Sequence, residues 1–239
     1  MINYNLILRQ VKDSYTELLQ DNLTGIYVHG SIAFNCFNPD KSDIDYIAVI
    51  NSPLTPDIKS KLIKETLRIN KSAPKKGLEM SVVLKEHCVS FKHPAPFELH
   101  FSNTHCETTS GVDKDLAAHF TIIKNAGVVL YGEPIDSVFG EVPKADYFDS
   151  IKSDIENAGD EISYNRFDLI LNLCRVLAYK QDGLILSKEA GGKWGLENVG
   201  EKYRSVIKTA FDRYLSAHDA VINHDLASDF YDYMLSRIS

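Results

Sequence analysis

The sequence predicts an α/β (α+β) N-terminal domain with a mixed sheet, residues 1–140, followed by an all-helical C-terminal domain, residues 141–239. Up to about residue 140, short apolar runs typical of strands alternate with segments whose apolar residues recur at helical spacing. From Val142-Pro143 onward the pattern is helical only. A length of 239 residues is enough for one large domain or two small ones.

Helix and strand patterns alternate through the first 84 residues. Helical spacing predicts an opening helix, and apolar runs predict strands at 25–28 and 45–50. Thr55 and Pro56 mark the beginning of a second helix, because Thr caps helix N-termini and Pro is favoured at the first helical position. A strand at 78–84 follows Gly77. The predicted buried faces are Leu8, Val11, Tyr15, Leu18 and Leu19 in the first helix, and Ile58, Leu62, Ile63 and Leu67 in the second.

The remainder of the first domain is predicted as loop, strand, helix and strand. Residues 85–96 carry two prolines and three charged side chains, which is typical of a loop. Residues 97–101 alternate between apolar and polar, as a half-buried strand does, and 128–131 form a short apolar run. The helix between these strands is expected to have an N-cap at Asp113, apolar residues Leu116, Phe120 and Ile123, and an end at Gly127.

The second domain is expected to contain only helices. Gly183 is expected to end one of them and Ser187 to cap the next. The apolar residues expected on buried faces are, in chain order, Ile151, Ile155, Ile170, Leu171, Cys174, Leu177, Ala178, Tyr203, Val206, Ile207, Ala210, Tyr214, Leu215, Leu226, Phe230, Tyr233 and Met234.

The acidic composition argues against a nucleic-acid partner. The formal net charge is −7 and the isoelectric point is about 5.6, and the sequence has no basic stripe of the kind that nucleic-acid-binding proteins carry. An acidic surface suits a small cationic substrate, although solubility alone accounts for the charge equally well.

We expect a cytoplasmic monomer that does not enter a membrane. No apolar run approaches the roughly 20 residues that span a bilayer, and the N-terminus lacks the pattern of a secretory signal. The cysteines lie far apart, as reduced structural thiols do. The His87-Cys88 and His105-Cys106 pairs are poor zinc chelators, because neighbours on a strand point to opposite faces. The cysteines are Cys36, Cys88, Cys106 and Cys174.

A Gly-Ser turn followed by two aspartates indicates a site that binds a cation and a phosphate chain. His29-Gly30-Ser31 ends one predicted strand and Asp43-Ile44-Asp45 begins the next. Side chains two apart on a strand share a face, so Asp43 and Asp45 can hold one cation, and Mg²⁺ prefers such hard oxygen ligands. Gly30 and Ser31 offer a phosphate chain close backbone approach, N–H groups and a hydroxyl. The alternative is a solvated turn or cap, which is common for an Asp-x-Asp at a strand entrance.

Glu79 supplies a third carboxylate, within an apolar run. Burying a charge is costly without a partner, and a metal and a substrate hydroxyl would be that partner. Gly-Ser, then Asp-x-Asp, then a later strand acid is the signature of the nucleotidyltransferase superfamily. Phosphoryl-type transfer needs charge neutralisation and in-line positioning, which these residue types provide.

Over nearly its whole length the chain resembles the bacterial aminoglycoside adenylyltransferases that modify spectinomycin and streptomycin. The Gly-Ser and Asp-x-Asp block marks only the superfamily, whereas the C-terminal blocks, in their order, are more specific to this family. Beyond the Gly30-Ser31 and Ser42-Asp43-Ile44-Asp45 block, the resemblance rests on Leu78-Glu79, 97–101, 113–117, Val142-Pro143, 171–175, 183–188 and Tyr214-Leu215.

The resemblance implies ATP as co-substrate, Mg²⁺ as cofactor, a small cationic antibiotic as acceptor, and an active site between the domains. It also implies a role for each matching residue. In the first domain, Asp43 and Asp45 would bind Mg²⁺ and Glu79 would be the general base. The triphosphate would be contacted by Gly30, Ser31 and Ser42. From the helical domain, Arg175 and Lys188 would reach phosphate, and Tyr214 would help to form the nucleotide pocket.

The residues of the second domain also have purely structural interpretations. Arg175 on an apolar helix can extend its charged end to solvent or pair with a neighbouring acid. Lys188, next to Glu189, can belong to a solvated helix start, and Tyr214 can pack in the core.

Some positions depart from the family pattern. Asn35 stands where a glycine is usual, and the Gly-Ser to Asp-x-Asp spacing is one residue longer than in the dual-specificity enzymes. Before the helix that carries Arg175, those enzymes share a Trp and an acid that serve streptomycin. Counting back from Arg175 without gaps reaches Glu156 and Glu161 at these positions, and the only tryptophan of this chain is Trp194. Asn165 falls where they carry an aspartate. The resemblance therefore favours AMP transfer to the 9-hydroxyl of spectinomycin over transfer to streptomycin.

Two other functions fit parts of the sequence. A nucleotidyltransferase with a protein or RNA acceptor would share the carboxylates, but the missing basic surface and the family-like second domain argue against it. A catalytically inactive nucleotide-binding module would have no chemical reason to keep Glu79 in an apolar strand. We therefore expect an enzyme, an aminoglycoside O-adenylyltransferase that gives antibiotic resistance.

Overall fold

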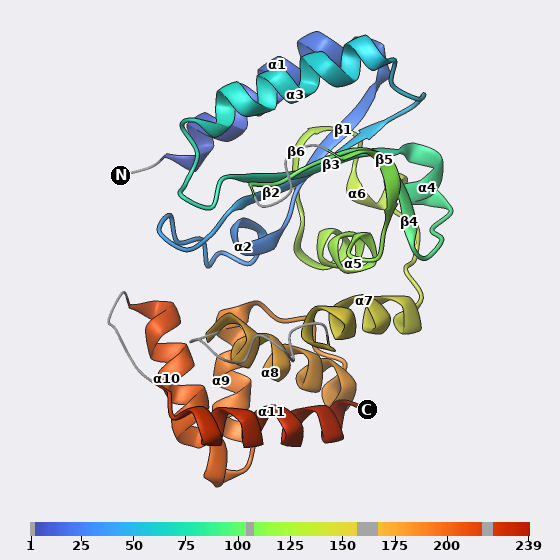
Figure 1. Ribbon diagram of the computed structural model, residues 1–239. Coiled ribbons are helices and arrows are strands. Elements are labelled where there is room, and N and C mark those ends of the chain that lie inside the picture. The colour runs from blue at the N-terminus through green and yellow to red at the C-terminus, as the bar shows by residue number, and fades with distance from the viewer. Residues whose placement is uncertain (1–2, 104–107, 157–166, 217–221) are drawn as a thin grey trace. The chain divides into compact units, whose positions relative to one another are not determined.

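The computed structural model describes residues 3–103, 108–156, 167–216 and 222–239. The chain divides into two compact units, Met1–Asp146 and Tyr147–Ser239. The first unit contains the sheet, and the elements of regular structure described in the second are all helices (Figure 1). The predicted fold class, a mixed sheet with helices followed by a helical region, is confirmed.

The first unit is built on a six-stranded sheet of order β5-β4-β3-β2-β1-β6. The central pair, β2 and β3, is parallel, and every other neighbouring pair is antiparallel, which makes the sheet mixed. The parallel register places residue 45 opposite residue 79. The strands are β1 (Leu23–Val28), β2 (Ile44–Ile50), β3 (Leu78–Leu84), β4 (Ala95–Phe101), β5 (Thr108–Asp113) and β6 (Val128–Gly132).

Helices cover both faces of this sheet. α1 and α3 lie side by side over one face, and α5 lies over the other (Figure 1). Thr55 caps α3 by accepting a hydrogen bond from the Ile58 N–H, with Pro56 at the first helical position, as predicted. The helices of the unit are α1 (Tyr4–Leu19), α2 (Gly30–Ala33), α3 (Pro56–Asn70), α4 (Lys85–Val89), α5 (Leu116–Ala126) and α6 (Ile135–Val138), with a 3₁₀ turn at Gln20–Asn22.

The core under α1 and α3 contains three buried hydroxyl groups. Tyr46 Oη donates to Tyr15 Oη across 3.1 Å, and Tyr15 Oη lies 2.8 Å from Thr66 Oγ1. The three side chains come from β2, α1 and α3. Because a buried hydroxyl is costly without a partner, this chain of hydrogen bonds fixes how the two helices pack on the sheet.

The structure corrects four details of the first domain. Leu67 is 39% exposed, because the buried face of α3 is formed by Leu62, Thr66 and Ile69. Residues 85–96 are not a continuous loop: Lys85–Val89 forms α4, which buries Cys88, and β4 already begins at Ala95. The strand β5 was not predicted. The N-cap position of α5 is Asp115, and Asp113 Oδ1 instead accepts from the Asp115 N–H at 2.9 Å.

In the second unit, α8 packs against α9, α10 and α11. The glycines of α9 allow this approach, because a Cβ at Gly191 or Gly195 would collide with side chains of α8. Ser187 caps α9, with its Oγ 3.0 Å from the Ala190 N–H, as predicted. Leu215, expected in the core, is 49% exposed. The helices are α7 (Lys144–Glu156), α8 (Phe167–Asp182), α9 (Lys188–Asn198), α10 (Arg204–Leu215) and α11 (His224–Ile238), with a 3₁₀ turn at Glu201–Tyr203.

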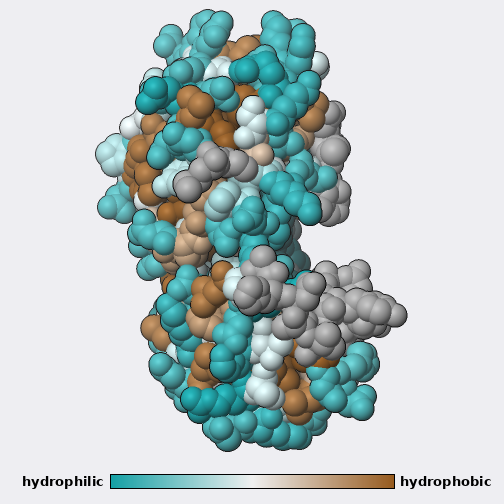
Figure 2. All heavy atoms as spheres, turned by 90° about the vertical axis from the view of Figure 1, so that its left-hand side faces the viewer, coloured by the Kyte–Doolittle hydropathy of each residue, from teal (hydrophilic) through white to brown (hydrophobic). Residues whose placement is uncertain are grey.

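The surface is mixed in character. On the face drawn in Figure 2, hydrophobic residues occur in small groups among hydrophilic ones. Within the described ranges, no helix is both long and apolar enough to cross a membrane.

Candidate active site

The Gly-Ser turn lies directly beside the second strand. Gly30 follows the end of β1 and has φ of +60°, a conformation that favours glycine. The backbone N–H of His29 donates to the carbonyl oxygen of Asp45 across 3.1 Å, which ties the turn to β2. The sequence therefore needs a glycine here both for its backbone conformation and for close approach to β2.

Asp43, Asp45 and Glu79 meet at the beginning of the two parallel strands. Asp43 directly precedes β2, Asp45 is its second residue, and Glu79 is the neighbour of Asp45 on β3. One carboxylate oxygen from each of the three lies within 4.8 Å of the others, and all three side chains are partly buried. This is the convergence that the sequence predicted, and three carboxylates at this spacing can hold a divalent cation.

The two serines of the predicted phosphate site differ in their partners. Ser31 Oγ is buried and has no hydrogen-bond partner within the described part of the chain. Ser42 Oγ accepts from the Asn38 N–H at 3.1 Å, inside the turn that precedes Asp43. A buried hydroxyl without a partner is costly, so Ser31 is suited to meet a ligand oxygen, whereas Ser42 shapes the loop.

Sequence reasoning missed a histidine next to Glu79. Nε2 of His119, on α5, lies 3.9 Å from Oε1 of Glu79. The ring of His119 packs on that of His29, with centroids 4.5 Å apart. Burial, and secondarily the charge of His119, lowers the pKa of His29 well below its usual value, so His29 is neutral at pH 7. The sequence does place His119 three residues after Leu116, on the same side of the predicted helix. Helical spacing alone, however, does not show that His119 faces Glu79.

Further polar groups continue along the same side of the sheet. Ser81, two residues after Glu79, has its Oγ 3.0 Å from Nδ1 of His100 on β4. Burial raises the pKa of Asp115, and the nearby His119 partly opposes that effect. The three-carboxylate cluster is therefore bordered by histidines and by a further, partly buried carboxyl group.

Arg175, Lys188 and Tyr214 lie in the second unit and are described within it. Arg175 donates from Nε to the Leu186 carbonyl at 2.8 Å and from Nη1 to Asn172 Oδ1 at 3.1 Å. Lys188 Nζ lies 3.3 Å from Asp168 Oδ1 at a partly exposed position. Tyr214 is partly buried on α10.

The positions linked to streptomycin are only partly described. Glu156 pairs with Lys152 at 3.0 Å. Trp194 donates from Nε1 to Asp182 at 2.7 Å and is buried among helices. Glu161 and Asn165 lie outside the described residues, as does the His105-Cys106 pair.

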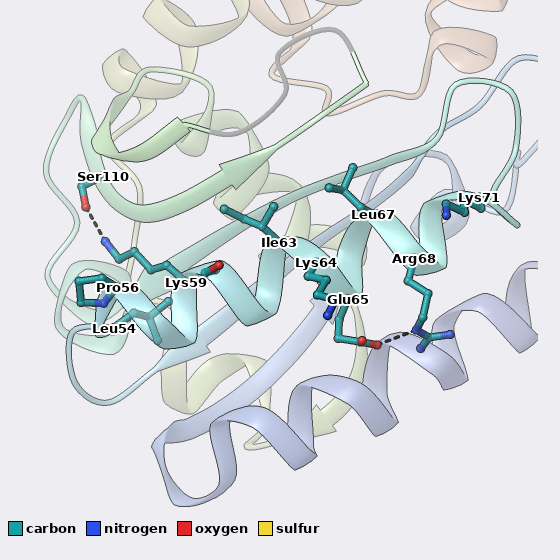
Figure 3. Close-up of a pocket in the computed structure, with 11 residues that line it drawn as sticks. Leu54, Pro56, Lys59, Ile63, Lys64, Glu65, Leu67, Arg68, Lys71 and Ser110 are labelled. Atoms are coloured by element: carbon teal, nitrogen blue, oxygen red, sulfur yellow. Dashed lines mark hydrogen bonds and ion pairs between the residues drawn. The ribbon is translucent and has the colours of Figure 1, made fainter.

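A groove of about 830 Å³ lies elsewhere on the first unit, along α3 and beside Ser110 (Figure 3). Two of its basic side chains are paired within the protein: Lys59 contacts Glu98 at 3.0 Å, and Arg68 contacts Glu65 at 2.7 Å. Met80 packs in the core under α3, so its neighbour Glu79 points to the opposite face of the sheet. The groove is therefore separate from the carboxylate cluster.

Known proteins match both parts of the chain. Residues 137–237 match the family described as the C-terminal domain of aminoglycoside adenylyltransferase. A spectinomycin 9-adenylyltransferase of Enterococcus faecalis is 26% identical over 220 residues, covering 87% of this chain and 86% of the relative. An aminoglycoside (3'') (9) adenylyltransferase of Klebsiella pneumoniae is 23% identical over 235 residues, covering 92% and 89%.

A solved structure has the same fold. The spectinomycin adenyltransferase of Enterococcus faecalis, determined with ATP and spectinomycin, superposes with a TM-score of 0.84 and covers 99% of both chains. The two sequences are 23% identical, so this match supports the fold alone.

The fold and the site are those of a nucleotidyltransferase: a mixed sheet carries a Gly-Ser turn and three acidic residues at the beginning of two adjacent parallel strands. Its helical unit matches the model of the aminoglycoside adenylyltransferase C-terminal domain, and over most of its length the chain is similar to aminoglycoside adenylyltransferases, the resemblance that the sequence predicted.

Proposed function

We propose that this chain transfers AMP from ATP to the 9-hydroxyl of spectinomycin and thereby gives resistance to the antibiotic. The observation that carries the proposal is the cluster of Asp43, Asp45 and Glu79 beside Gly30-Ser31, in a chain related along its length to enzymes named for this reaction. The proposal treats the chain as a monomer acting in the cytoplasm, where ATP is available.

The donor set fits Mg²⁺. Asp43 and Asp45 would hold the ion, since carboxylates that share one face are the ligands it prefers. When bound, the ion neutralises charge on the phosphates and polarises the phosphoryl group under attack. The buried Ser31 Oγ, which has no hydrogen-bond partner among the described residues, supports a phosphate oxygen as its partner in the complex.

Glu79 is proposed as the general base. Its carboxylate accepts the proton of the antibiotic hydroxyl as the hydroxyl oxygen forms a bond to the α-phosphorus of ATP. The bond from the α-phosphorus to the bridging oxygen breaks, and pyrophosphate leaves with the electron pair. AMP stays on the antibiotic as an ester. The position of Glu79 on a central strand suits this role, because a rigid element fixes where the backbone of the base lies.

The second unit is proposed to supply nucleotide contacts. Two hydrogen bonds hold the Arg175 guanidinium, which fixes its direction. Lys188 has one partly exposed pairing, with Asp168, that a phosphate oxygen can replace. Tyr214 is proposed to line the nucleotide pocket.

The test is to incubate the purified protein with ATP, Mg²⁺ and spectinomycin and to follow the mass of the drug and the release of pyrophosphate. We expect AMP on spectinomycin, no product after chelation of the metal, and no product from the Asp45→Asn variant. Expression in a susceptible bacterium tests resistance in the same way. ATP binding without transfer of AMP to any aminocyclitol or aminoglycoside would contradict the proposal and would point instead to a nucleotide-binding module.

A further inference from the structure

His119 contacts both segments that carry the carboxylate chemistry. Leu116, Phe120 and Ile123 pack α5 into the core on this side of the sheet, and His119 lies on the same side of the helix, one turn from Leu116 and from Ile123. Its Nε2 lies 3.9 Å from Glu79 Oε1 on β3, and its ring packs on His29, the residue before Gly30.

Within the part of the chain that the structure describes, His119 is the one basic side chain within pairing distance of Glu79. The Glu79 side chain is 31% exposed and the His119 side chain 18%, so solvent reaches the carboxylate from one side while the imidazole borders another. A base that solvent reaches can take up several rotamers, and only some of them direct an oxygen at the acceptor hydroxyl.

We propose that His119 is a positioning residue for Glu79. Its Nε2–H donates to Oε1 and holds the carboxylate, so that Oε2 is left to take the proton of the acceptor hydroxyl. The gap of 3.9 Å must shorten by about 1 Å to become a hydrogen bond, and catalytic hydrogen bonds commonly tighten only in the substrate complex. This inference rests on the proposed function, because it assigns His119 to the base of that reaction.

The packing of His119 on His29 gives the imidazole a fixed plane. His29 is buried, and its backbone is anchored to Asp45, so it forms a rigid surface against which the His119 ring lies at 35°. Rigid support of this kind is what makes a neighbouring group an effective orienting partner.

Three substitutions of His119 separate positioning from packing. His119→Leu keeps volume but removes the donor, and we expect kcat for AMP transfer to fall about 10- to 100-fold, as for a misplaced catalytic group. The KM for ATP should change little. His119→Gln places an amide nitrogen near the Nε2 position and should restore most of kcat, whereas His119→Asn places its amide near the Nδ1 position and should not.

A matched control is available in the same unit. His87 on α4 lies 3.9 Å from Glu86, the same distance between the same atoms, away from the carboxylate cluster. His87→Leu should leave kcat unchanged. In a Glu79→Gln background, His119→Leu should lower kcat no further, because the base it positions is already lost. Unchanged kcat in His119→Leu, or a His119→Gln variant no better than His119→Leu, would overturn the inference.

Crystal structures with Mg²⁺ and a non-hydrolysable ATP analogue give a readout that does not depend on turnover. We expect Nε2 of His119 within hydrogen-bond distance of Glu79, and a single Glu79 rotamer, in the wild type. His119→Leu should show several rotamers. If Glu79 keeps one rotamer in that variant, the positioning role is wrong. If the wild-type protein transfers AMP to no antibiotic, the proposed function fails, and these structures still decide the inference.

Discussion

Gly30 and Asp45 fill adjoining space, because a Cβ at residue 30 would overlap Oδ2 of Asp45. Gly30 also has φ of +60°, where an L-residue is strained. We therefore predict that Gly30→Ala displaces the Asp45 carboxylate and lowers both metal affinity and kcat. Mn²⁺ titration followed by electron paramagnetic resonance, together with steady-state kinetics, measures both effects.

Gly183→Ala is the control for Gly30→Ala. Gly183 has φ of +69°, but a Cβ there would meet no atom within 4 Å. Backbone strain alone should cost about 1 kcal/mol of stability and leave metal binding and kcat intact. If the two variants lose equal activity, strain rather than displacement of Asp45 is the cause.

Glu79→Gln keeps the shape of the side chain and removes its basicity. We predict that ATP and Mg²⁺ bind as in the wild type and that kcat falls by about 10² or more, the usual contribution of a general base. Asp45→Asn should instead weaken metal binding first. Calorimetric titration with a non-hydrolysable ATP analogue separates the two variants. A Glu79→Gln variant with near wild-type kcat would remove the general-base assignment.

The sequence predicted the carboxylate cluster because the geometry of strands is regular. Residues two apart share a face, and Glu79 is found on the neighbouring strand to Asp45. The buried face of α3 was less predictable, because Thr66 is buried by a hydroxyl contact with Tyr15 that hydropathy does not reveal. The role of His119 depends on how α5 approaches β3, which no local pattern encodes.

The edge strand β5 escaped prediction for a related reason. Its Thr108–Asp113 segment has few apolar residues and does not alternate between polar and apolar ones, so its strand conformation comes from pairing with β4 rather than from its own pattern. A strand of this composition can be recognised only from the neighbouring strand with which it pairs.

Lys188→Ala tests the nucleotide contact of the second unit. If Lys188 binds phosphate in the complex, its loss removes a charge-assisted hydrogen bond worth about 1.5–3 kcal/mol, so the KM for ATP should rise about tenfold or more. The KM for the drug should change much less. Lys193→Ala is the matched control, because Lys193 on the same helix pairs with Glu189 at 2.6 Å and is 60% exposed. An unchanged KM for ATP would show that Lys188 forms only a surface ion pair with Asp168 and does not contact the nucleotide.

The buried Tyr15–Tyr46 pair predicts a loss of stability in alkaline solution. Burial raises the pKa of both phenols above the ordinary value of 10.0. The folded protein therefore keeps protons that the unfolded chain releases above about pH 10. The stabilising contribution is complete below that pH and is lost as the pH rises toward the folded pKa, by up to about 1.4 kcal/mol per pH unit for each phenol.

Tyr46→Phe should remove one of these two contributions. At pH 7 the variant loses the hydrogen bond from Tyr46 to Tyr15, about 1 kcal/mol, so its Tm should be lower. Between pH 8 and pH 11 its Tm should fall less steeply than that of the wild type. Tyr131→Phe, at a 41% exposed position, is the control. Parallel Tm curves for wild type and Tyr46→Phe would contradict the assignment.

We expect the enzyme to favour spectinomycin over streptomycin as its acceptor. Spectinomycin is small and rigid, so Glu79 and a few polar groups can orient it, whereas streptomycin is longer and carries guanidinium groups that need acidic and aromatic partners. Trp194 is buried and donates to Asp182, so it is not available for that purpose. Glu156 pairs with Lys152, which offsets part of its charge. We expect kcat/KM for spectinomycin to exceed that for streptomycin by at least about 10²-fold, the discrimination that lost polar partners can produce. Measuring both drugs under identical ATP and Mg²⁺ decides the question, and comparable values would show that other groups supply the missing contacts.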